Sequence, residues 1–136
     1  MAAYVTGDIH GGFDLQKVRE WDESVGCTLK HDDYLIIAGD FGYPWSYSKR
    51  EAEEILWLES RTYTVLFVDG NHERYDFWQK RPYEEWHGGK TQRLLNDGRT
   101  CRLCRGQVFD ICGNSVFTMG GATSVDRDVR VPQVSW

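Results

Sequence analysis

The sequence predicts an α/β fold in which a parallel sheet with flanking helices is followed by a group of short strands. Over the first half of the chain, three apolar runs of strand length alternate with two segments of helical periodicity. After Pro82, glycines separate short runs rich in apolar and β-branched residues. A β-α-β-α-β order predicts parallel strands with right-handed crossovers and helices on the faces.

The first strand is predicted at residues 2–6, where a short run ends at Gly7. An amphipathic helix is predicted from Asp14 to about Ser24. Apolar residues recur there at nearly helical spacing, at Leu15, Val18, Trp21 and Val25.

The second strand is predicted at residues 34–38, a continuous apolar run typical of a strand buried on both faces. Ser48, followed three positions later by Glu51, forms a capping box at the start of the next helix. Residues 62–68 are rich in β-branched and aromatic residues and predict the third strand.

The second half of the chain is predicted to form short strands at residues 91–95, 102–104, 107–111 and 115–119. Gly113-Asn114 predicts a hairpin turn between the last two. The tail, residues 122–136, is predicted to be loop. A chain of 136 residues predicts a single domain over residues 1–136.

Composition narrows the class of protein. Apolar residues make up 40% of the chain, which is enough for a packed core, and the formal net charge is −5. A negative chain is a poor nucleic-acid binder, so nucleic acid is expected only as a substrate. We find neither a basic leader followed by an apolar run nor an apolar run of about 20 residues. The sequence therefore predicts neither export nor membrane insertion. We therefore expect a cytoplasmic protein whose four cysteines are reduced.

Metal-ligand residue types follow each of the three predicted strands directly after a glycine. Asp8 and His10 follow the first, Asp40 follows the second, and Asn71 and His72 follow the third. Because parallel strands present their carboxyl ends at one edge of a sheet, these side chains are expected to meet there. The pattern therefore predicts one metal site.

The chemistry of these residues suits divalent cations. In an extended Asp8-Ile9-His10 segment, the first and third side chains share a side and can bind one ion. Asp40 has two oxygens and can bridge two ions, while Asn71 offers an amide oxygen to the second. Mixed oxygen and imidazole donors suit Mn²⁺, Fe, Zn²⁺ or Ni²⁺, with Mg²⁺ as a further candidate.

Two such ions would bind a phosphate and lower the pKa of a bridging water. Asp40 and His72 are then the predicted catalytic residues, with His72 protonating the leaving oxygen. Glu73 is placed to orient His72. Asn71 and His72 are the predicted substrate contacts.

Three sequence blocks resemble the first signature blocks of the calcineurin-like metallophosphoesterases. These blocks are Gly7-Asp8-Ile9-His10-Gly11, Gly39-Asp40 and Gly70-Asn71-His72-Glu73, and Met119-Gly120-Gly121-Ala122 is similar to small bacterial and phage members. The resemblance implies a β-sandwich flanked by helices and metal-dependent hydrolysis of phosphate mono- or diesters. It also implies Asp8 and His10 on the first metal, Asp40 bridging, Asn71 on the second, and His72 as proton donor.

The chain departs from that family pattern in its second half. The later Gly-His and Gly-His-x-His blocks are absent, since the chain has four histidines and none follows His87. The second metal keeps only Asp40 and Asn71. We therefore expect one ion or none, Mn²⁺ before the others. We also expect a C-terminally truncated, incomplete sandwich that forms a homo-oligomer or needs a completing protein chain.

Several functions remain open from the sequence. The first is a metal-dependent phosphoesterase that is complete only as an assembly or through replacement ligands. The second is a non-catalytic binding or regulatory remnant that acts through a partner. A metal-free nucleotide-binding domain fits poorly, because no Gly-rich phosphate loop of the Gly-x-x-x-x-Gly-Lys type is present. Cys101-x-x-Cys104 is interpreted as small apolar residues on strands. Trp45 either packs or flanks a substrate ring.

Overall fold

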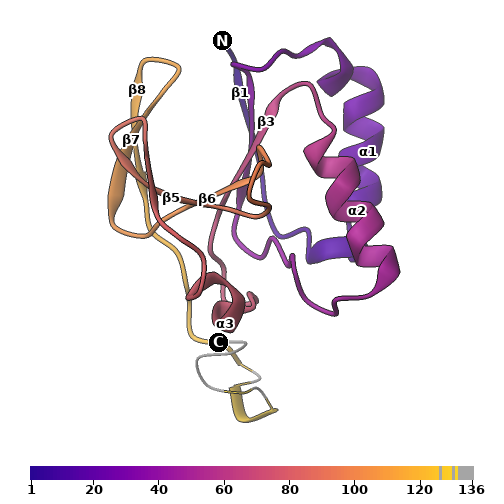
Figure 1. Cartoon of the computed structure of the whole chain (residues 1–136), viewed down its shortest axis with the longest axis vertical. Helices are drawn as coiled ribbons and strands as arrows, with labels where there is room; N and C mark the ends of the chain where they lie inside the picture. The colour runs from indigo at the N-terminus through magenta and orange to yellow at the C-terminus, as the bar shows by residue number, and fades with distance from the viewer. Residues whose placement is uncertain (126, 130, 132–136) are drawn as a thin grey trace.

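Two β-sheets organise the chain in the computed structural model, which describes residues 1–125, 127–129 and 131. The larger sheet has six strands in the order β1-β2-β3-β6-β5-β4, and the smaller has the two strands β7 and β8 (Figure 1). The predicted mixed α/β fold with flanking helices is confirmed.

The first half of the chain builds the parallel part of the large sheet. Its elements are β1 (Ala3–Thr6), α1 (Leu15–Ser24), β2 (Tyr34–Ala38), α2 (Lys49–Glu59) and β3 (Thr64–Val68). β1 pairs with β2 and β2 pairs with β3, in both cases in parallel. The predicted β-α-β-α-β order is confirmed. The third strand begins two residues later than predicted.

The second half adds antiparallel strands. They are β4 (Glu84–Trp86), β5 (Gly89–Arg93), β6 (Cys101–Leu103), β7 (Gln107–Ile111) and β8 (Asn114–Thr118). β6 joins the large sheet by pairing in parallel with β3. The helix α3 (Tyr75–Trp78) and β4 were not predicted, because one turn is too short to show periodicity and β4 begins with two glutamates.

The tail differs from the all-loop expectation, since a 3₁₀ turn, η3, covers Arg127–Val129. Residues 126, 130 and 132–136 of the predicted loop lie outside the described residues. Across the described part of the chain, no helix has the length and apolar character needed to cross a bilayer.

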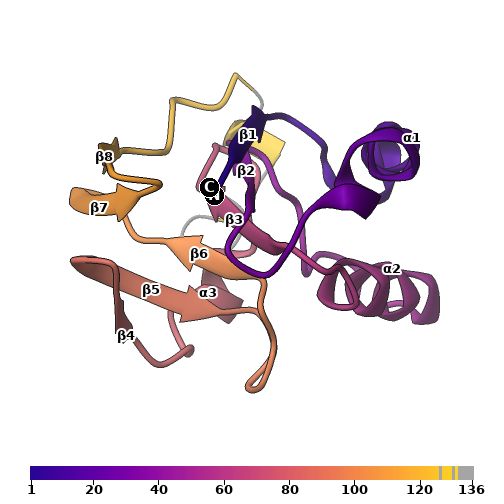
Figure 2. The same cartoon turned by 90° about the horizontal axis from the view of Figure 1, so that it is seen from above.

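Helices α1 and α2 cover one face of the parallel strands, and the β7–β8 hairpin lies on the other side (Figures 1 and 2). Alternate residues of β2 show how both faces are buried. Leu35 and Ile37 belong to the core under the helices, whereas Tyr34 and Ile36 belong to a second cluster with Phe109 of β7. The continuous apolar run of β2 thus reflects burial on two sides.

The edge of the large sheet at β1 is open. All four residues of β1 are exposed, and no described residue pairs with the edge that faces away from β2. Val5 keeps 68% of its surface exposed. A groove of about 1040 Å³ runs between this edge and the hairpin, lined by Val5, Ile36, Val68, Val116, Phe117 and Met119 among others. The second sheet therefore covers the first only in part.

Candidate metal centre

Three loops meet at the carboxyl ends of β1, β2 and β3, and main-chain hydrogen bonds hold them side by side. The Asp8 N–H donates to the Gly39 carbonyl at 2.9 Å, and the His10 N–H donates to the Asp40 carbonyl at 2.8 Å. The Gly39 N–H donates in turn to the Val68 carbonyl at 3.0 Å. The parallel sheet thus continues as paired loops, which brings the side chains after each strand to one place.

The side chains of His10, Asp40 and His72 form a compact group of candidate metal ligands. One donor atom from each lies within 4.8 Å of the others. The His10 Nε2 atom lies 3.5 Å from Asp40 Oδ2 and 2.8 Å from Asp8 Oδ1. The rings of His10 and His72 are perpendicular, with centroids 5.0 Å apart. All three loops therefore contribute to one group.

The loop after β1 is not extended, which corrects the expected geometry of Asp8-Ile9-His10. Asp8 has φ 62° and His10 has φ 48°, so both adopt the left-handed conformation. Asp8 and His10 nevertheless meet, while Ile9 between them is buried in the core. Asp40 also has a positive φ of 48°. Such conformations are uncommon for residues with a side chain and cluster at functional sites.

Asp40 is held by the loop that follows β3. Its Oδ1 atom accepts a hydrogen bond from the His72 N–H at 2.9 Å, and its side chain is only 12% exposed. A Cβ atom on Gly70 would lie 1.8 Å from this same oxygen, so only glycine fits there. The Gly70-Asn71-His72 segment therefore both contacts and positions the carboxylate.

Glu73 is fully buried and binds main chain rather than an imidazole. Its carboxylate accepts from the N–H groups of Phe41 at 2.9 Å, Gly42 at 3.1 Å and Gly70 at 3.3 Å. Burial raises the pKa of Glu73 to about 8, although these three N–H groups favour the charged form. Contrary to the expectation that it orients His72, Glu73 ties the second loop to the third.

Asn71 faces the groove that also contains Asp8 and Asp40. Its amide nitrogen donates to the hydroxyl of Ser124 at 3.2 Å, and Ser124 is buried. This contact across 53 positions of sequence fixes which way the amide points. No sequence pattern pointed to Ser124, since a serine in a polar tail has many ordinary roles.

The donor chemistry fits a divalent transition metal. His10, Asp40 and His72 offer two imidazoles and a carboxylate, and Asp8 adds an exposed carboxylate beside His10. Sequence reasoning assigned His72 to proton transfer and substrate contact but not to the metal, whereas its ring also lies within range of a shared ion. For the expected second ion, Asp40 and Asn71 remain the only predicted ligands.

The other candidate metal ligands, two cysteines and His87, lie outside this group. Cys101 and Cys104 are buried free thiols, and burial raises the pKa of Cys101 to about 11. His87 stacks on Trp86 with ring centroids 3.8 Å apart, and its Nδ1 lies 2.8 Å from the Asp110 carbonyl oxygen. Within the described ranges, His10, Asp40 and His72 are the one such His, Cys, Asp and Glu group compact enough for a metal.

Comparison with known proteins gives one match. A family model described as calcineurin-like phosphoesterase matches residues 1–135. No curated protein and no solved structure matches the chain.

Proposed function

Because the chain belongs to the calcineurin-like phosphoesterase family, we propose that it hydrolyses phosphate mono- or diesters with a bound divalent metal. The observation that carries the proposal is the convergence of His10, Asp40 and His72 from three separate loops. Residues brought together from such distant positions, with left-handed backbone at two of them, are typical of a functional site.

The proposed roles are those that the resemblance to the family implies. Asp8, His10 and Asp40 would hold the first ion, and Asp40 with Asn71 would hold any second ion. A bound metal supplies an activated water and polarises the phosphate. Asn71 contacts the substrate from the groove side. His72 stands across from His10 and donates a proton to the leaving oxygen.

Mn²⁺ is the proposed metal, with Fe, Zn²⁺, Ni²⁺ and Mg²⁺ as alternatives, and one ion or none is expected per chain. Metal analysis after dialysis against Mn²⁺ tests this number. The His72→Ala variant separates its two roles. A proton donor can be removed without changing metal content, whereas a ligand cannot.

The deciding experiment is a hydrolysis assay with Mn²⁺, using a generic aryl phosphate monoester and diester. The Asp40→Ala and His72→Ala variants are compared with the parent chain. His31→Ala is the matched control, because His31 is exposed and outside the metal centre. The proposed enzyme activity is supported if both site variants lose hydrolysis and the control variant keeps it. Parent activity no higher than that of the variants, at every metal concentration, contradicts it.

A second candidate is a binding or regulatory remnant of the fold. It is favoured by the sparse second site, where Asp40 and Asn71 are the only predicted ligands. Stoichiometric metal binding without turnover is its expected signature. The same assay, read beside metal content, therefore separates the two functions.

We also propose that a second copy of the chain covers the open edge at β1. Val5 and Phe117 expose 68% and 61% of their surface beside an unpaired strand, which is a template for strand pairing. A cytoplasmic location is proposed with it, in keeping with the expected reduced thiols. Measurement of mass in solution should show a dimer or larger species, whereas a stable monomer contradicts the assembly.

A further inference from the structure

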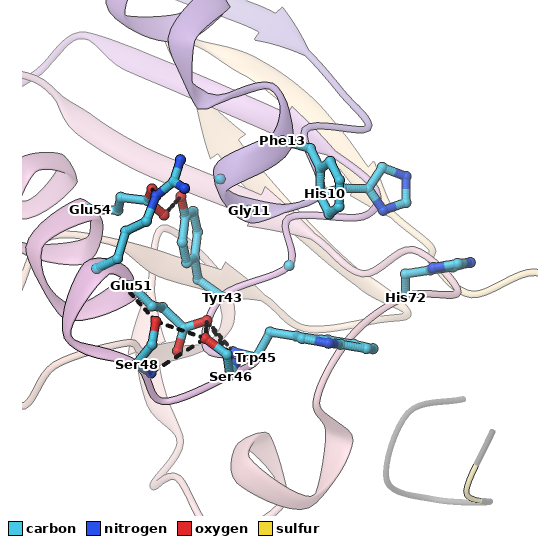
Figure 3. Close-up of a pocket in the computed structure, with 13 residues that line it drawn as sticks. His10, Gly11, Phe13, Tyr43, Trp45, Ser46, Ser48, Glu51, Glu54 and His72 are labelled. Carbon is cyan, nitrogen blue, oxygen red and sulfur yellow. Dashed lines mark hydrogen bonds and ion pairs between the residues drawn. The ribbon is translucent and has the colours of Figure 1, made fainter.

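A hollow of about 460 Å³ opens directly beside the metal centre. His10 and His72 form part of its lining, so the hollow and the metal centre share two residues (Figure 3). The volume lies in the range of about 300–1,000 Å³ that small-molecule sites occupy. An ester whose phosphate lies at His10 and His72 would extend its organic group into this space.

Two partly or largely exposed aromatic side chains form part of the walls of this hollow. Phe13 and Trp45 lie on opposite sides of the opening, with His10 beside Phe13 and His72 on the open side (Figure 3). Phe13 is 90% exposed and Trp45 is 41% exposed, so both leave ring surface outside the core. Tyr43, by contrast, is buried and lies deeper in the hollow. Such walls favour stacking against a planar ring.

Hydrogen bonds hold the main chain of Trp45 in place. The carboxylate of Glu51 accepts hydrogen bonds from the N–H groups of Trp45 at 2.7 Å, Ser46 at 2.9 Å and Tyr47 at 2.8 Å. The Trp45 carbonyl accepts from Arg74 Nη1 at 2.9 Å. Because this main chain is already ordered, less ordering free energy is lost when a ligand binds against Trp45.

The inner end of the hollow disfavours a negatively charged organic group. Two carboxylates, those of Glu51 and Glu54, line it together with Arg50. Glu54 accepts from the Tyr43 hydroxyl at 2.8 Å and from Arg50 Nε at 3.0 Å. With two acids against one base, further phosphates or carboxylates on the ligand would meet repulsion.

We propose that the hollow between Phe13 and Trp45 receives an uncharged planar ring, a phenyl group or a nucleobase, carried by a phosphate monoester. The substrate class is thus an aryl phosphate or a nucleoside monophosphate. The proposal rests on the proposed function, because it takes the phosphate position from the metal centre.

The test compares phenyl phosphate, adenosine 5′-monophosphate and glycerol phosphate in the presence of Mn²⁺. We expect the parent chain to prefer at least one ring substrate over glycerol phosphate by about ten-fold or more in kcat/KM. In Trp45→Ala and Phe13→Ala that ratio should collapse through a raised KM for the ring substrate. Tyr83→Ala, which removes an exposed aromatic outside the hollow, should keep it. Whichever of phenyl phosphate and adenosine 5′-monophosphate has the higher kcat/KM shows whether the hollow prefers a phenyl group or a nucleobase.

A ring preference that survives in both Trp45→Ala and Phe13→Ala overturns the proposal. So does an equal loss on glycerol phosphate, which would show a merely structural role. If the parent chain hydrolyses no ester, the proposed function fails and the hollow is judged by binding. Phenyl phosphate and adenosine 5′-monophosphate are then titrated calorimetrically with Mn²⁺ present. The hollow is supported if the parent chain binds a ring ligand, Trp45→Ala weakens that binding and Tyr83→Ala leaves it unchanged. The proposal is overturned if the parent chain binds neither phenyl phosphate nor adenosine 5′-monophosphate.

Discussion

Single residues in unusual backbone conformations position the metal centre. Asp8, His10 and Asp40 all have positive φ values between 48° and 62°. An L-residue pays about 1–2 kcal/mol for this conformation, so the surrounding contacts must hold it. Main-chain bonds from Asp8 and His10 to the second loop supply part of that support.

Gly70 is the residue at which a single methyl group should disturb the centre most. In Gly70→Ala the new Cβ would lie 1.8 Å from Asp40 Oδ1, so the carboxylate must move. We expect Mn²⁺ affinity to fall at least ten-fold, measured by isothermal titration. Gly113→Ala is the control, because nothing lies within 4 Å of its missing Cβ. Gly113 has a positive φ, unlike Gly70, so this control adds backbone strain without a clash. Equal affinity in the two variants would contradict this reading.

Glu73 should contribute to stability through the main chain. In Glu73→Gln the amide NH₂ faces an N–H donor of Phe41, Gly42 or Gly70, which leaves a buried donor unsatisfied. We expect the free energy of unfolding to fall by about 1–3 kcal/mol. Urea denaturation measures it. An unchanged unfolding midpoint would show that Glu73 does not tie the loops.

At the scale of elements, the start of α2 controls the wall of the aromatic hollow. Ser48 Oγ accepts from the Glu51 N–H at 3.2 Å, which is one half of the predicted capping box. The other half differs, because the Glu51 carboxylate binds the N–H groups of Trp45, Ser46 and Tyr47 instead of returning to Ser48. The helix cap thereby also fixes the preceding loop.

Two substitutions separate the capping of α2 from the support of the loop that precedes it. Ser48→Ala should lower the free energy of unfolding by about 1 kcal/mol, as expected for a lost N-cap. Glu51→Ala should cost more, since several N–H groups lose their acceptor, and should also weaken binding of the ring substrate. Urea denaturation and KM measure the two effects. A Ser48→Ala variant with the larger loss would contradict the assignment.

At the scale of the whole molecule, the open edge of β1 is the dominant exposed feature. Val5 lies in this edge strand, and a charge there should discourage strand pairing. We expect Val5→Lys to shift the chain from a self-associated form toward the monomer in sedimentation velocity. Hydrolysis by the parent chain and by the variant is also compared at low concentration, where both are monomeric. Leu56→Lys, also at an exposed apolar residue but on α2 away from the edge, is the control. The same shift in both would show a nonspecific effect of charge.

Sequence patterns identified the elements that have long apolar runs. The strand at Tyr34–Ala38 was predicted to the residue, because an uninterrupted apolar run reports burial on both faces. α3 and β4 were missed, since four and three residues show no period. The extended geometry expected for Asp8-Ile9-His10 was wrong, because local sequence does not reveal a left-handed backbone stabilised by a neighbouring loop.

The sequence by itself determined the family and the parallel half of the fold, because those depend on motif spacing and on hydrophobic periodicity along the chain. Tertiary structure alone placed Glu73 on three main-chain N–H groups and Ser124 on Asn71. It also joined the aromatic hollow to His10 and His72. These contacts link positions far apart in sequence, and their partners are set by how the loops pack, which no local pattern encodes.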